Sequence, residues 1–93
     1  MQLQVLASKF VLALNVENIV LYNNSKTFLE ISTPNHDAYR ISCNSSNKNE
    51  TESFNKDCMN LIKEWFSGRD TFVLTLESYD VKLEKSSLSS HIE

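Results

Sequence analysis

The side chains able to do chemistry are few and are widely spaced along the sequence. His36 and Asp37 are adjacent, an arrangement in which a carboxylate could poise an imidazole as a general base. No cysteine or serine stands at a recognisable spacing from this pair, so it has no nucleophile to activate. We therefore expect His36 to be an exposed turn residue, and the sequence predicts no catalytic residue and a protein that is not an enzyme.

The remaining carboxylates do not form an obvious pair. General acid–base catalysis by two acids needs both groups in one concave site with separated pKa values. Here the acids fall at expected turns or on outward strand faces, where water solvates them. The residues considered are Glu17, Glu30, Asp37, Glu77, Asp80 and Glu84.

Neither a metal site nor a nucleotide site is indicated. Zinc would need all of Cys43, Cys58, His36 and His91 as ligands, and their spacing fits no zinc finger. Gly68 is the only glycine, whereas the P-loop and the dinucleotide fingerprint each need several. We therefore expect neither a metal nor a cofactor.

The cysteines and the apolar segments indicate a cytoplasmic protein. Cys43 and Cys58 both fall on predicted apolar faces, which favours two buried, reduced thiols; a disulfide between them is the open alternative. Residues 1–16 lack the basic start of a secretion signal. The longest apolar run, Phe10 to Leu14, is much shorter than the ~20 residues that span a bilayer.

Size and charge narrow the class of protein. A chain of 93 residues is long enough for one small domain, which we place at residues 1–85 with a frayed tail at 86–93. Nine basic and twelve acidic side chains give a net charge of −3. Nucleic-acid binding needs a basic surface, so this balance argues against a nucleic-acid partner.

The element best defined by its pattern is a helix beginning at Asn49. Asn49 is predicted to cap it, with Glu52 reaching back to the cap, and Gly68 is predicted to end it. Leu61, Ile62 and Trp65 are expected to be its most buried positions. The apolar stripe with a 3.6-residue period consists of Phe54, Cys58, Leu61, Ile62, Trp65 and Phe66.

Four strands are predicted before the helix. Residues 2–8 fit a strand and a helix about equally well, and this ambiguity stays open. Polar turns separate the later runs, and the second and third strands form the clearest hairpin. The predicted strands cover residues 10–16, 19–22, 27–32 and 38–43.

Two further strands are predicted after the helix, at 72–76 and 81–85. Their apolar positions are even-numbered in the first and odd-numbered in the second, so one regular strand cannot contain both. A bulge or a turn at residues 77–80 would explain the change, and we favour the turn. The predicted fold is α+β with the order ββββαββ. Its five to six antiparallel strands have one amphipathic helix on one face, or form a partly closed barrel.

Because the sequence contains no catalytic, metal-binding or nucleotide-binding motif, the predicted function is binding to another protein. The chain is similar in size, charge and layout to small acidic inhibitor and immunity proteins. A small subunit of a larger complex could have the same features. A small-ligand or lipid-binding module is the alternative. Aromatic residues beside acids suggest the contact, because aromatics dominate many interfaces. The predicted partner-binding residues are Glu77, Tyr79, Asp80, Glu84 and Trp65.

Overall fold

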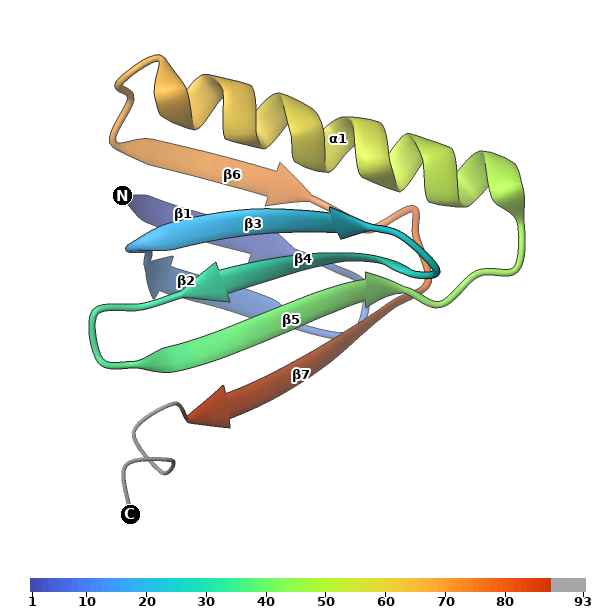
Figure 1. Ribbon diagram of the computed structural model, residues 1–93, viewed down its shortest axis with the longest axis horizontal. Helices are drawn as coiled ribbons and strands as arrows, with labels where there is room; N and C mark the ends of the chain where they lie inside the picture. Colours follow the sequence, from blue (N-terminus) through green and yellow to red (C-terminus); the bar gives the residue numbers. More distant parts are fainter. Residues whose placement is uncertain (88–93) are drawn as a thin grey trace.

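The computed structural model describes residues 1–87, which form an α+β fold of seven strands in two sheets with one helix (Figure 1). The first sheet has the order β2-β1-β6 and the second has the order β3-β4-β5-β7. The elements are β1 (Gln2–Leu6), β2 (Val11–Asn15), β3 (Asn18–Asn23), β4 (Thr27–Ser32), β5 (Asp37–Cys43), α1 (Lys48–Phe66), β6 (Thr71–Thr75) and β7 (Val81–Ser87).

The two sheets face each other across one apolar core. The helix α1 lies along one side of the sandwich and contacts β3, β4 and β6, as Figure 1 shows. Alternate residues of the strands point inward, because the side chains of a strand alternate between its two faces. The largest fully buried side chains, from both sheets and the helix, are Phe54, Leu3, Leu29, Ile31, Ile41, Leu76, Val5 and Cys58.

The chain passes between the sheets at two tight points. At the first, Val16 N donates to Met1 O in one sheet (2.6 Å), and the next residue, Glu17, donates its N–H to Ser32 O in the other sheet (2.7 Å). At the second, the segment 76–80 joins β6 to β7. The turn predicted at 77–80 is therefore confirmed, and it allows the even-numbered and the odd-numbered apolar positions to be buried in one core.

The prediction of one antiparallel sheet is wrong. The structure has two sheets, and the first is mixed, because β1 pairs antiparallel with β2 and parallel with β6. The ambiguous residues 2–8 contain a strand, which gives five strands before the helix. In residues 1–87 the sheets do not close into a barrel. The parallel pairing joins β1 to β6, which are far apart in the sequence, so no local pattern reveals it.

Most predicted strands are confirmed. The segment Thr27–Ser32 is β4 with the predicted bounds, and it pairs with β3 as a hairpin. The last strand lies at the edge of its sheet and extends beyond the predicted Lys85 to Ser87. The rest of the predicted tail, residues 88–93, lies outside the described residues.

The predicted helix is confirmed, but its start and its buried face differ in detail. Asn47, not Asn49, is the N-cap, and its side chain accepts a hydrogen bond from the Asn49 N–H (2.9 Å). Gly68 follows the helix with φ +95°, as the stop signal predicts. The buried helix residues are Phe54, Cys58 and Leu61, whereas Ile62 and Trp65 are half-buried.

Within residues 1–87, no helix combines the length and apolar character needed to cross a membrane.

Candidate protein-binding surface

Tyr79, a predicted contact residue, connects the 76–80 turn to α1. Its side chain is only 8% exposed, and its ring packs edge-to-face on Phe54 with centroids 5.9 Å apart. The Tyr79 hydroxyl donates to Asp57 Oδ2 (2.6 Å) and lies 2.9 Å from Ser53 Oγ. Burial raises the pKa of Tyr79, and the hydrogen bond to Asp57 acts in the same direction. The ring therefore holds the turn in place and is not exposed for a partner.

We expect Tyr79→Phe to destabilise the fold by about 1–2 kcal/mol, because Asp57 loses a buried donor while the ring packing is kept. Chemical denaturation at neutral pH measures this change. Tyr22→Phe is the matched control, since Tyr22 is 38% exposed, and it should change stability by no more than about 0.5 kcal/mol. Equal effects of the two variants would contradict the role assigned to the Tyr79 hydroxyl.

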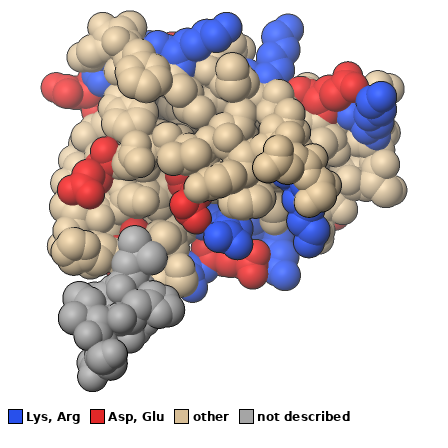
Figure 2. Space-filling view, in the orientation of Figure 1, with Lys and Arg blue, Asp and Glu red and all other residues tan. Residues whose placement is uncertain are grey.

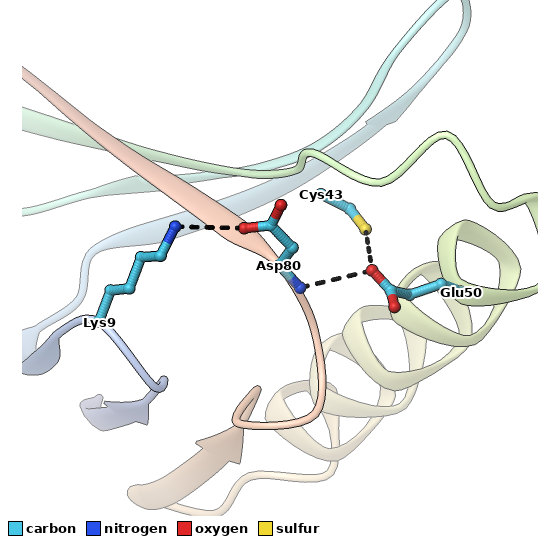
Figure 3. A network of polar contacts seen from close by, with 4 residues as sticks. All are labelled: Lys9, Cys43, Glu50 and Asp80. Carbon is cyan, nitrogen blue, oxygen red and sulfur yellow. Dashed lines mark hydrogen bonds and ion pairs between the residues drawn. The ribbon is translucent and has the colours of Figure 1, made fainter.

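A second polar network holds the other side of this turn (Figure 3). Glu50 Oε2 accepts from the Asp80 N–H (3.4 Å) and from the Cys43 thiol (3.8 Å). Lys9 Nζ lies 3.4 Å from Asp80 Oδ1, with side chains that are 73% and 54% exposed. Exposed ion pairs of this kind contribute little to stability. The network joins four segments of the chain: the β1–β2 turn, the end of β5, the first turn of α1 and the 76–80 turn.

The two cysteines are free, as predicted, but only one is fully buried. Cys58 is 0% exposed and Cys43 is half-buried. Burial raises the pKa of the Cys58 thiol to about 12, and Asp57 and Cys43 add to this shift. Cys58 is therefore a core residue with an unreactive thiol.

His36 occupies an exposed turn between β4 and β5, as expected. Its φ of +67° is in the left-handed region, which residues other than glycine seldom adopt. The carboxylate of the neighbouring Asp37 lies 3.9 Å from Lys85 Nζ. His91, the other histidine, is outside the described residues, and among residues 1–87 no group of three His, Cys, Asp or Glu side chains is placed to hold a metal ion.

The five predicted contact residues do not form one surface. Glu77 and Asp80 are exposed beside the N-terminal half of α1, and Glu84 lies on the outer face of β7 opposite Arg40. Trp65 is twelve residues beyond Ser53, the helix residue that contacts the turn, which is about 18 Å along the helix axis. The structure thus places Trp65 at the opposite end of α1 from the acidic turn, contrary to the sequence-based placement. Whether the acids contact a partner stays a prediction.

Sequence reasoning missed an apolar surface on one side of α1. Met59, Ile62 and Phe66 are spaced by three and four residues, so they lie in one row, which we call the α1 ridge. Phe66 is 80% exposed and Met59 is 42% exposed. Trp65 is half-buried, and its ring stacks on Phe66 with centroids 5.7 Å apart. The sequence pattern placed Phe66 on the apolar stripe of the helix, and the spacing of Met59 from Ile62 and Phe66 was the signal overlooked.

Basic side chains flank this ridge. Lys56 and Lys63 lie three residues before and four residues after Met59, so both are its neighbours on the helix surface, and both are exposed. In the orientation of Figure 1, Figure 2 shows both basic and acidic side chains along the edge of the molecule where α1 lies. The ridge thus has two exposed lysines beside Met59.

Comparison with protein-family models, with curated proteins and with solved structures found no match. The function is therefore inferred from the surfaces of the molecule.

Proposed function

We propose that this protein is a non-catalytic domain that binds another protein through the α1 ridge. The observation that supports this most directly is the exposure of Phe66, an aromatic side chain 80% accessible to water and stacked on Trp65. Contiguous exposed apolar side chains are typical of interaction sites, and aromatic residues often supply most of the binding energy.

Two of the three ridge residues, Met59 and Phe66, are exposed, whereas Ile62 packs against the edge of the core. The core face of α1 is formed by Phe54, Cys58 and Leu61, whereas Phe66 and Met59 are exposed on another side of the helix. Covering Phe66 and Met59 would remove apolar surface from water at about 25 cal/mol per Å². A partner surface is the simplest way to gain this stabilisation.

The border of the ridge defines the chemistry of the partner. Lys56 and Lys63 would face carboxylates around an apolar centre, and such complementarity mainly raises the association rate. An inhibitor or immunity-type protein, or a small subunit of a complex, would use the surface in this way. The acidic residues Glu77, Asp80 and Glu84 form a second candidate contact, for a basic partner surface.

The alternative function, binding a small apolar ligand or lipid, has less support. A hollow of about 800 Å³ lies between the β3–β4 turn and the segment that leads into α1. Apolar ligands are bound in pockets lined mainly by apolar side chains. This hollow is bordered mostly by polar and charged residues, among them Asn23, Lys26, Lys48, Glu52, Lys82 and Glu84.

Phe66→Ser is expected to weaken binding of the partner by ~2 kcal/mol, or about thirtyfold in Kd, as removal of a central aromatic usually does. The partner is first identified by native pull-down from the source cells, and its affinity is then measured by calorimetry. Val73→Ser is the matched control, because Val73 is also an exposed apolar residue (56%) but lies on β6. It should bind like the native protein.

Asp80→Lys separates the two candidate contacts. If Asp80→Lys binds the partner with native affinity and Phe66→Ser binds it more weakly, the α1 ridge is supported as the contact. Native affinity of Phe66→Ser would exclude the ridge, and a loss confined to Asp80→Lys would assign binding to the acidic turn. The absence of any stoichiometric protein partner would contradict the proposal.

A further inference from the structure

Of the four edge strands in residues 1–87, β2 is the least protected against pairing with another strand. An exposed edge strand offers unpaired N–H and C=O groups, and proteins usually protect it with charges or cover it. The edges β3 and β6 are flanked by α1, and β7 carries Lys82, Glu84 and Lys85. The sequence of β2, Val-Leu-Ala-Leu-Asn, has no charge and no proline, and α1 packs mainly on β3, β4 and β6.

The hydrogen bonds between β1 and β2 show which backbone groups remain free. Val16 N donates to Met1 O and the Met1 amino group donates to Val16 O at one end of the ladder, and Ala7 N donates to Phe10 O at the other. Bonded and non-bonded pairs alternate along an antiparallel ladder. With the observed register, the bonded pairs between these ends are Leu3 with Leu14 and Val5 with Leu12.

It follows that Val11, Ala13 and Asn15 direct their backbone N–H and C=O groups away from β1. These three residues are exposed, and Val11 is 64% accessible. They form the free edge of the first sheet. A strand added there would use only these groups and would leave the β1–β2 pairing intact.

We propose that a second copy of this chain occupies this edge, so that two β2 strands pair antiparallel about a two-fold axis at Ala13. In this register Val11 of each copy lies opposite Asn15 of the other, and the three residue pairs exchange about six backbone hydrogen bonds. Leu12 of one copy lies opposite Leu14 of the other on the inner face. Both leucines are half-buried in the single chain, so the pairing would cover them further.

The charges near β2 favour a second copy over an unrelated partner. Lys9 lies two residues before Val11, and Glu17 lies two residues after Asn15, and both are exposed. The proposed register therefore brings Lys9 of one copy to the end of the ladder where Glu17 of the other lies. This happens twice, once at each end. Lys9 and Glu17 are equally far in sequence from Ala13, so only the register centred on Ala13 places them opposite each other.

The outer face of the first sheet is also compatible with self-association. A two-fold axis brings equivalent residues together, so a charge near the axis would meet its own copy. The residues that point outward from this sheet carry no charge. They are every second residue of each strand, beginning with Gln2 in β1, Val11 in β2 and Thr71 in β6. Joining two copies would produce a continuous six-stranded sheet with an uncharged outer face.

Sedimentation equilibrium over a micromolar to millimolar concentration range tests the proposal, together with amide hydrogen exchange. The native chain is expected to form a dimer in which the amides of Val11, Ala13 and Asn15 exchange slowly. A monomer throughout the range would overturn the proposal. So would a dimer in which these three amides exchange as freely as exposed ones, because the interface would then lie elsewhere.

Ala13→Lys should raise the dissociation constant of the dimer at least about tenfold, because two lysines would meet across the axis. Gln4→Lys is the matched control: Gln4 is opposite Ala13 in the ladder and on the same exposed face, but on the inner strand β1. It should dimerise like the native chain. Equal effects of the two variants would contradict the β2 interface.

A charge exchange gives a second test that does not alter β2. Glu17→Lys should weaken the dimer, and Lys9→Glu added to it should restore most of the affinity, because the opposite charges are again at each end of the ladder. Failure of the second change to restore affinity would exclude the proposed register. The test is independent of the α1 ridge, and Phe66→Ser should dimerise normally.

Discussion

Phe54→Ala is expected to lower the free energy of unfolding by about 3–5 kcal/mol, because it removes a large side chain from a closely packed interior. Phe54 is 0% exposed, and its ring contacts Tyr79 edge-to-face. It is the point at which the helix, the core and the 76–80 turn meet. In a small domain this loss is a large share of the total stability. Urea denaturation of the native and variant chains measures it.

Phe66→Ala provides the matched control for this measurement. It makes the same change in the same helix, but at a residue 80% exposed, and it should alter stability by no more than about 0.5 kcal/mol. If the two variants lost equal stability, the assignment of Phe54 to the core and of Phe66 to the surface would be wrong.

The second large effect is a loss of stability in alkaline solution caused by Cys58. Its pKa is raised by burial from 9.0 to about 12, so the folded chain strongly prefers the neutral thiol. The stabilisation is complete below pH 9.0 and is lost as the pH rises toward 12, because the unfolded chain ionises first. Between about pH 9 and pH 11 the cost is about 3 kcal/mol, since each pKa unit corresponds to about 1.4 kcal/mol.

Cys58→Ala isolates this contribution, because alanine is small and apolar and does not titrate. Stability is measured by urea denaturation at about pH 8 and about pH 11 for both chains. The native chain should lose about 3 kcal/mol more than the variant, since the other titrating groups are common to both. Parallel losses in the two chains would show that Cys58 is not the buried thiol described.

Local patterns were sufficient to define most of the secondary structure. The stripe from Phe54 to Phe66 identified the helix, and Gly68 identified its end, because a 3.6-residue period and a left-handed stop are properties of the local chain. The change of phase between the strands at 72–76 and 81–85 identified the turn between them. The reason is the same, since side chains alternate along any strand whatever its neighbours.

Those local patterns could not predict which of the aromatic side chains are exposed on the surface. Tyr79 between two acids looked like a contact residue, but it is buried against Phe54. Its hydroxyl donates to Asp57 and lies 2.9 Å from Ser53 Oγ, and both residues are more than twenty positions earlier in the chain. The exposure of Phe66 rather than Trp65 depends on which side of α1 meets the sheets. Both outcomes follow from contacts between distant segments.

The arrangement of the strands was likewise decided by the tertiary structure. The pattern at residues 2–8 fitted either a helix or a strand, and the strand prevails because β1 is paired on both sides, by β2 and by β6. The parallel pairing of β1 with β6 divides the strands into two sheets and leaves β2 at a free edge. Hydrogen-bond partners that are far apart in a chain leave no periodic pattern in its sequence, whereas the alternation within each strand does.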